Sequence, residues 1–354
     1  MARIVIAGAG TVGCYIGGLL ASAGHDVTLY GRSRVLNQIQ THGLTLTDTG
    51  GQSHWVSAQQ IRLCEDPYSI DRGDIVLVCA SSIDTSAIAR EIAGNARPDA
   101  VVVALQNGLE STLVLQRALP HHDVRAGMVG FNIIAEGQGV YHRAVSGEIR
   151  IEAGGGDIAK ALSVPGLKVG ESDDIHGEQW GKLMLNLANG LNALAGQSLR
   201  DLLLDRDWRR VYADQIVEAL KVLKAARIYP KLPLPIPVGL LPFALRMPTW
   251  IFKRAARNMV TIDPESKTSM ARDLDAGRKT EIAAFQGAIV ELGEGYGVPT
   301  PVSRRVMELV RAAELRKAGC PGLAPADLSG PVIPQGYAAR TSDGEVNAYS
   351  PSGG

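Results

Sequence analysis

The feature that most constrains this chain is a glycine-rich turn that follows a short apolar run near its first residues. Residues 3–7 read Arg-Ile-Val-Ile-Ala, which suits a buried parallel strand, and an apolar stretch of helical period covers 14–23. The turn between them consists of Gly8, Ala9, Gly10, Thr11, Val12 and Gly13. Glycines at this spacing allow a tight turn, leave room for a pyrophosphate and let the helix pack closely on the strand. Because the positive end of the helix faces that space, the stretch predicts a binding site for a dinucleotide.

The residue that follows the second strand indicates which dinucleotide binds. Residues 27–30 complete a strand-helix-strand unit of about 30 residues. Dinucleotide sites usually place an acidic residue here for the ribose 2′-hydroxyl, whereas this chain has Arg32. An arginine would hold a 2′-phosphate through forked, charge-assisted hydrogen bonds, so the sequence predicts NADP(H) rather than NAD(H). A lone glycine motif occurs in many turns and Arg32 could simply be solvated, but strand, helix and arginine together favour the cofactor site.

Length, charge and cysteine usage narrow the class of protein further. The chain has 354 residues and a formal net charge of +0, which favours two domains and argues against nucleic acid as the main partner. Its cysteines are Cys14, Cys64, Cys79 and Cys320. They lie far apart, so we expect reduced thiols in the cytoplasm. No metal is expected, because the adjacent His121 and His122 lack ligand partners at metal-site spacing.

A largely apolar stretch over 236–252 raises the question of a membrane segment. Pro237, Pro242, Arg246 and Pro248 interrupt it, and it is shorter than the run of about 20 apolar residues that spans a bilayer. We therefore expect a packed helical insertion or lid and no integral membrane segment. Peripheral membrane contact is the less favoured alternative.

The first half of the chain alternates between expected strands and helices, which predicts an α/β fold. Apolar strands are expected over 74–80, 101–105 and 124–131. Ligands of open α/β sheets bind outside the carboxyl ends of the strands. Ser81, Asn107 and Asn132 follow these three ends and are therefore expected beside a bound cofactor. Short antiparallel strands are then expected over 133–135, 140–143 and 148–152.

The second half of the chain has a helical period almost throughout. Helices are expected over 175–195, 207–228, 238–257, 266–276, 280–296 and 301–317. We therefore predict an N-terminal Rossmann-type NADP-binding domain over 1–170 and a C-terminal all-helical domain for substrate and catalysis over 171–327. The last stretch, 328–354, is rich in Pro, Gly, Ser and Asp without periodicity and is expected to be a poorly ordered tail.

The helix expected over 175–195 carries a polar stripe on an otherwise apolar surface. Lys182, Asn186 and Asn189 are spaced by four and three residues and so lie on one side of the helix. Such a helix should be buried, and burying a lysine is costly unless a function requires it. The alternative is that Lys182 reaches water while the asparagines cap neighbouring backbone.

A second group of polar residues surrounds the start of the helix expected over 280–296. Ser269 begins the preceding helix, Thr280 can cap the next one, and Glu281 follows in its first turn, where the helix dipole favours a carboxylate. On its own, this pattern describes a plain helix start.

Taken in order, these motifs resemble the ketopantoate reductases (2-dehydropantoate 2-reductases). They are the glycine motif at 8–13, Arg32, Gln106-Asn107-Gly108, Trp180-Gly181-Lys182 with Asn186, and Ser269-Met270 with Glu281. The resemblance covers about residues 3–314. Each motif alone is weak, whereas the ordered set of five is specific.

The resemblance implies NADPH-dependent reduction of 2-dehydropantoate to pantoate, on the route to pantothenate and coenzyme A. By position, it implies that Lys182 donates the proton and that Glu281 completes the catalytic centre. It further implies that Asn186 and Ser269 hold the substrate and that Asn107 touches both nicotinamide and substrate.

Two departures from the family pattern weaken the assignment of the substrate. The family commonly has a lysine where this chain has Ser81. Its second substrate asparagine would fall at Gly190, whereas here Asn189 lies about 100° away around the helix. The insertion over 229–258 suits a longer branch of the family.

The chemistry can also be reasoned without the resemblance. Hydride transfer to a ketone leaves charge on oxygen, and a protonated lysine can neutralise that oxygen as the charge forms. Three readings stay open: a ketopantoate reductase, an NADP-dependent reductase of another 2-oxo acid or imine, and a non-catalytic NADPH-binding module. The sequence also leaves the oligomeric state, including a homodimer, open.

Overall fold

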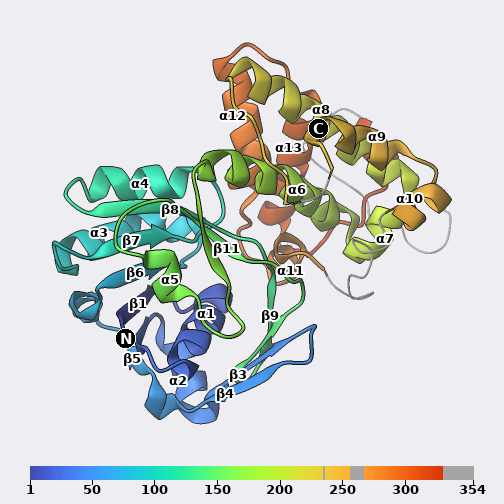
Figure 1. Ribbon diagram of the computed structural model, residues 1–354. Coiled ribbons are helices and arrows are strands. Elements are labelled where there is room, and N and C mark those ends of the chain that lie inside the picture. Colours follow the sequence, from blue (N-terminus) through green and yellow to red (C-terminus); the bar gives the residue numbers. More distant parts are fainter. Residues whose placement is uncertain (234–235, 256–266, 330–354) are drawn as a thin grey trace, which may run out of the picture.

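A computed structural model describes residues 1–233, 236–255 and 267–329 of the chain. The N-terminal half is built around a large sheet with helices on both faces, and the C-terminal half is helical (Figure 1). This arrangement confirms the expected fold class. The tail predicted over 328–354 begins within the described residues, where the short turn η6 (Pro325–Ser329) ends and Leu328 is buried against the helical core. Its remaining part, 330–354, lies outside the described residues.

The large sheet has eight strands in the order β12-β11-β8-β7-β6-β1-β2-β5. The strands are β1 (Arg3–Ala7), β2 (Asp26–Tyr30), β5 (Arg62–Cys64), β6 (Ile75–Val78), β7 (Val101–Ala104), β8 (Asp123–Val129), β11 (Ile149–Glu152) and β12 (Val169–Ser172). In this spatial order, the six neighbouring strands β8, β7, β6, β1, β2 and β5 run parallel to one another. β11 runs antiparallel to β8. The order of the strands along the chain reverses between β1 and β6, which is where open α/β sheets bind ligands.

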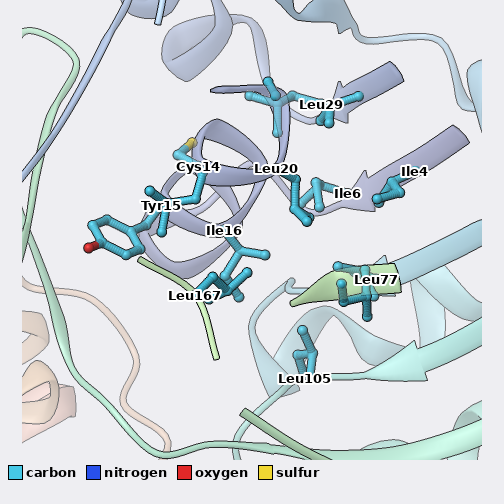
Figure 2. Packing of buried hydrophobic residues seen from close by; sticks show 14 of the residues in the cluster. Ile4, Ile6, Cys14, Tyr15, Ile16, Leu20, Leu29, Leu77, Leu105 and Leu167 are labelled. Carbon is cyan, nitrogen blue, oxygen red and sulfur yellow. The ribbon is translucent and has the colours of Figure 1, made fainter. Parts of the chain in front are cut away.

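Alternating residues of the central strands face two separate helical layers. Ile4 and Ile6 of β1 pack with α1 (Thr11–Ser22), α2 (Ser33–His42) and α5 (Ile158–Leu162). Figure 2 shows these two isoleucines beside residues of α1. Val5 and Ala7 point to the other face and pack with α3 (Thr85–Asn95) and α4 (Glu110–Ala118). Burial on both faces explains why these strands read as unbroken apolar runs.

A second sheet of four strands lies beside α1 in the order β4-β3-β10-β9. Its strands are β3 (Leu44–Asp48), β4 (Ser53–Val56), β9 (Ile133–Gly137) and β10 (Val140–Arg143). The expected antiparallel pairing of β9 with β10 is confirmed. The expectation that β11 continues this antiparallel run is wrong. Ile149 and Ile151 are buried in the main core, and β11 pairs with β8, whose edge would otherwise be unpaired.

The helical half is organised around one long helix, α6. Its helices are α6 (Ile175–Ala195), α7 (Leu199–Leu204), α8 (Arg206–Ala225), α9 (Leu241–Arg246), α10 (Thr249–Ala255), α11 (Ser269–Asp275), α12 (Ala288–Gly295) and α13 (Pro301–Arg316). α6 packs against α8, α11 and α13 and also reaches β8 and β11 of the large sheet. The Asp174 carboxylate caps its first turn, and Gly196 at φ +69° ends it.

The predicted helices of this half differ from the observed ones at prolines and at one π-helical turn. The helix expected over 238–257 is divided into η4 (Val238–Leu240), α9 and α10, because Pro248 cannot continue a helix. Its expected end at 256–257 lies outside the described residues. The helix expected from Thr280 begins at Ile282 and contains the π-helical turn η5 (Ala283–Gly287).

The insertion packs on α8 and leaves some large side chains in water. Leu241, Leu245 and Phe252 are buried in the helical core, whereas Phe243 and Trp250 are 69% and 73% exposed. Within the part of the chain that the structure describes, no helix combines the length and the apolar character needed to cross a membrane.

Candidate active site

The glycine turn after β1 excludes side chains at two of its three glycines. A Cβ atom on Gly8, whose φ is +112°, would come within 2.4 Å of the Ala80 backbone nitrogen. A Cβ atom on Gly13 would come within 2.3 Å of the Gly8 carbonyl oxygen. A Cβ atom on Gly10 would make only an ordinary van der Waals contact, 3.8 Å from the Cys79 carbonyl oxygen, and Gly10 itself is exposed. The first and third glycines are therefore required by packing, whereas the second is not.

Backbone N–H groups are available at this turn. The N–H groups of Gly8 and Ala9 both donate to the Tyr30 carbonyl, at 3.0 Å each, which ties the turn to β2. α1 begins at Thr11 without a side-chain cap, so the N–H groups of Thr11 and Val12 lack intrahelical acceptors. Together with the positive end of α1, these donors can bind an anion.

Arg32 lies at the end of β2, directly before α2. Its guanidinium is 83% exposed and donates to the Asp84 carboxylate at 3.0 Å. Asp84 ends the short 3₁₀ turn η3 (Ser82–Asp84) that follows β6. The arginine therefore bridges the ends of strands on both sides of the glycine turn.

A pocket lies between the carboxyl ends of the sheet strands and the helical half, and Lys182 is one of its lining residues. The lining residues are Gln106, Asn107, Gly108, Leu109, Gly127, Met128, Gln179, Lys182, Leu183, Asn186 and Phe285. They come from the ends of β7 and β8, from α6 and from η5. α6 is fixed here because the Gln179 side-chain amide donates to the Gly127 carbonyl at 2.9 Å.

Lys182 and Glu281 meet through the side chain of Asn107. The Lys182 ammonium donates to Asn107 Oδ1 at 3.1 Å, and Asn107 Nδ2 donates to Glu281 Oε2 at 3.1 Å. The other carboxylate oxygen of Glu281 accepts from the backbone N–H and the hydroxyl of Ser82, at 3.2 and 2.8 Å. Two residues of the sheet half thus contact two residues of the helical half in one continuous network.

Burial makes Lys182 easier to deprotonate than an ordinary lysine. Burial lowers the pKa of its ammonium to about 8, although the nearby Glu281 carboxylate acts in the opposite direction. A lysine with such a pKa can give up a proton near neutral pH and recover it afterwards.

Of the other residues expected at the site, one lines this pocket and four do not. Asn186 lines it, one turn along α6 from Lys182. Asn189, half-buried on the same helix, and Ser269, exposed at the start of α11, are not among its lining residues. Ser81 and Asn132 are exposed at the ends of β6 and β8. Substrate and cofactor contacts by these four residues stay predictions.

Gly190 faces away from the pocket into the helical core. A Cβ atom there would come within 2.7 Å of Gln286 Nε2 and 3.0 Å of Val306 Cγ1. The buried Gln286 amide donates to the Leu187 carbonyl at 2.8 Å and to Gln215 Oε1 at 3.0 Å. A longer side chain at Gly190 would therefore displace a hydrogen-bonded glutamine.

Sequence reasoning missed the roles of three residues that shape the site, although Gln106 belongs to one of the motifs. Ser82 binds Glu281, Asp84 binds Arg32, and the Gln106 amide donates to the carbonyls of Ala80 and Ser81. Ser82 and Gln106 each adjoin a residue that was singled out. Their position at a strand end was the available signal, but their partners are far away in the chain.

Comparison with known proteins identifies the family to which the chain is similar. Residues 4–156 match the family described as ketopantoate reductase PanE/ApbA, and residues 174–314 match its C-terminal counterpart. A 2-dehydropantoate 2-reductase from Halobacterium salinarum is 27% identical over 321 residues, covering 88% of this chain and 99% of that protein.

Solved structures show the same architecture. A PanE/ApbA family ketopantoate reductase from Ralstonia eutropha JMP134 is 32% identical, with a TM-score of 0.76, covering 89% of this chain and 99% of that one. A D-mandelate dehydrogenase solved with NADH and anilino(oxo)acetate shares the fold, with a TM-score of 0.74 and 24% identity over 89% of this chain and 99% of that one. The chain described here belongs to the PanE/ApbA ketopantoate reductase family.

Proposed function

We propose that this protein reduces 2-dehydropantoate to pantoate with NADPH, and that Lys182 supplies the proton. The observation that carries the proposal is the contact between the Lys182 ammonium and Asn107 at the carboxyl end of β7. That end lies on the side of the sheet where ligands of open α/β folds bind.

The glycine turn fits a dinucleotide. The exposed backbone at Gly10, the first N–H groups of α1 and the basic end of β2 would hold the pyrophosphate and a 2′-phosphate. Ser81, Asn107 and Asn132 would lie along the rest of the cofactor. NADPH, when bound, supplies a hydride to the carbonyl carbon of the substrate.

Lys182 would complete the reaction on the oxygen of the same carbonyl. As the carbonyl carbon gains the hydride, its oxygen gains negative charge and takes a proton from the lysine ammonium. Asn107 holds the ammonium in place through one of its three N–H bonds and leaves two for the substrate. The neutral lysine then regains a proton from solvent.

Arg32 supports the preference for NADPH. Its guanidinium is pre-placed at the end of β2 and exposed, so it can turn from Asp84 to a 2′-phosphate. A phosphate with about two negative charges would compete well with one solvent-exposed carboxylate. The resulting arrangement would favour NADP(H) over NAD(H).

The walls of the pocket suit a small 2-oxo acid with an apolar branch. Asn186 at the pocket, with Asn189 and Ser269 nearby in the helical half, would bind the hydroxyl and carboxylate groups of the substrate. Leu183, Met128 and Phe285 form an apolar surface for its methyl groups. The same surface would accept other branched 2-oxo acids, which is the main alternative.

The test is an assay of NADPH oxidation with 2-dehydropantoate beside a panel of branched and aromatic 2-oxo acids and cyclic imines, with NADH in parallel. The proposal predicts the highest kcat/KM for 2-dehydropantoate with NADPH. A higher value for another 2-oxo acid or imine would move the assignment to that substrate. NADPH binding without oxidation for any of them would indicate a non-catalytic module.

The compartment follows from the same reasoning. The four cysteines are free thiols in the structure, and Cys14 is buried. We propose the cytoplasm as the place of this activity, because free thiols persist in a reducing compartment.

A further inference from the structure

Ser82 makes a contact across the two halves of the molecule that no motif of the sequence identifies. Its hydroxyl donates to Glu281 Oε1 at 2.8 Å, and its backbone N–H donates to the same oxygen at 3.2 Å. The two residues are 199 positions apart in the chain. Two donors on one carboxylate oxygen restrict its position.

On the sheet side, a buried glutamine holds the segment that carries Ser82. Gln106 is 7% exposed, and the two N–H groups of its amide are shared among three acceptors: the carbonyls of Ala80 and Ser81, each 3.1 Å from Nε2, and Thr85 Oγ1 at 2.9 Å. The Thr85 hydroxyl in turn donates to the Ser82 carbonyl at 2.8 Å. The hydroxyl of Ser82 is therefore presented by a segment with little freedom to shift.

On the helical side, the backbone beside Glu281 is anchored independently. The N–H and hydroxyl of Thr280 donate to Glu314 Oε1 of α13 at 2.6 and 2.7 Å, and Thr280 is buried. The Thr280 hydroxyl also accepts from the Ile282 N–H at 3.3 Å. The direction in which Glu281 leaves the backbone is thus set before Ser82 engages its carboxylate.

We propose that Ser82 is a positioning residue for the reduction: it holds the Glu281 carboxylate against Asn107, and Asn107 holds the Lys182 ammonium. This inference rests on the proposed function for its kinetic consequences. The nucleotide would lie between the glycine turn and the end of β6, so the same short segment would adjoin the cofactor and orient the proton donor.

The charged groups around Lys182 determine whether its pKa falls or rises when Ser82 no longer holds Glu281. Glu281 is the carboxylate that acts on it, and Asp273 of α11 lies near enough to Glu281 to interact with it. Arg278 binds Asp273 at 2.7 Å, and Arg272 lies beside both. Glu178, one turn before Lys182 on α6, is already bound by Ser172 and Arg150. Releasing Glu281 therefore removes a negative charge from Lys182 without supplying another.

The test compares Ser82→Ala, Ser82→Val and Ser82→Thr, with Ser86→Ala on the exposed side of α3 as the matched control. Loss of the hydroxyl in Ser82→Ala and Ser82→Val should lower kcat about tenfold and move the alkaline limb of the pH profile to lower pH. The KM for NADPH should change little. Ser82→Thr keeps the hydroxyl and the shape of Val, and it should restore both readouts.

A second measurement keeps this inference separate from the proposed reaction. The ammonium of Lys182 can be titrated by NMR through 13C-labelled lysine side chains, with Lys182→Met identifying the signal. Ser82→Ala should lower the titration midpoint, whether or not any 2-oxo acid is a substrate. An unchanged midpoint, or a raised KM for NADPH with an unchanged pH profile, would overturn the positioning role of Ser82.

Discussion

The two halves of this protein encode their parts of the site in different ways. The part of the site proposed to bind the phosphates lies within one continuous stretch, from β1 through the glycine turn to Arg32. The catalytic part of the helical half combines Lys182 of α6 with Glu281, which lies about a hundred positions further along the chain and just before η5. A local motif can therefore reveal the first part, whereas the second exists only once distant segments have packed.

The largest expected effect comes from removing Lys182, the proposed proton donor of the helical half. Lys182→Ala should lower kcat by about 10²–10⁴-fold, because no other group that lines the pocket carries a proton-donating ammonium. NADPH affinity, measured by fluorescence titration, should stay within a few fold, since the glycine turn is untouched. Lys224→Ala on the exposed side of α8 is the control. A comparable loss of NADPH affinity in Lys182→Ala would show that the helical half also contributes to cofactor binding.

The next largest effect is a loss of stability, because a buried arginine of α8 binds the backbone of the insertion over 229–258. Arg209 of α8 is fully buried and donates to the carbonyls of Leu203, Leu245 and Met247 at 2.9–3.0 Å, while its guanidinium lies 4.4 Å from the Phe252 ring centre. Arg209→Met would leave these carbonyls without a donor, and we expect a loss of about 3 kcal/mol in the free energy of unfolding.

Urea unfolding followed by circular dichroism would measure this loss, with the exposed Arg210→Ala as the control. NADPH affinity of the folded variant should be unchanged. A loss below about 1 kcal/mol would mean that the insertion is held by apolar packing alone.

A smaller effect should follow from the arginine of the nucleotide-binding half. Arg32→Ala should lose about 1.5–3 kcal/mol of the preference for NADPH over NADH, the usual size for a hydrogen bond to a charged group. The ratio of the two kcat/KM values measures this preference. Arg34→Ala, two residues further along, should leave the ratio unchanged. Equal use of NADH by the unaltered protein would remove the basis for this prediction.

The smallest expected effect is a shift in the pH dependence of kcat/KM when Glu281, which contacts the sheet half, loses its charge. Glu281 raises the pKa of Lys182 against the stronger effect of burial, so Glu281→Gln should lower that pKa. The alkaline limb of kcat/KM should then move to lower pH by up to about one unit, while the exposed Glu291→Gln on α12 leaves it in place. A limb that moves to higher pH would contradict the assigned sign.

Much of the nucleotide-binding half was predictable because its signals are local. The apolar strands, the glycine turn and the parallel order follow from residues that are neighbours in the sequence. β4 and β5 were missed, since Ser-His-Trp-Val and Arg-Leu-Cys are too short to show a strand pattern of their own. The predicted pairing of β11 was wrong, because its partner is the unpaired edge of β8 and its own residues do not specify that partner.

The site was predictable only as a set of parts. Spacing along one helix placed Lys182 and Asn186 on the same side, and both line the pocket. That Glu281 bonds to Asn107 and Ser82 rather than directly to Lys182 could not be deduced, because the contact depends on how the halves meet. Likewise, the salt bridge from Arg32 to Asp84 joins segments 52 residues apart.

The most direct test of the account is the pH dependence of a single turnover in which the NADPH-loaded protein reduces 2-dehydropantoate. Only the protonated form of Lys182 can donate, so the rate constant should be level at low pH. Above the lysine pKa of about 8 it should fall about tenfold per pH unit. The Lys182→Ala variant should be slow and lack this limb. A rate constant that does not change from pH 6 to about 10, or the same limb in Lys182→Ala, would contradict the assignment of Lys182 as the proton donor.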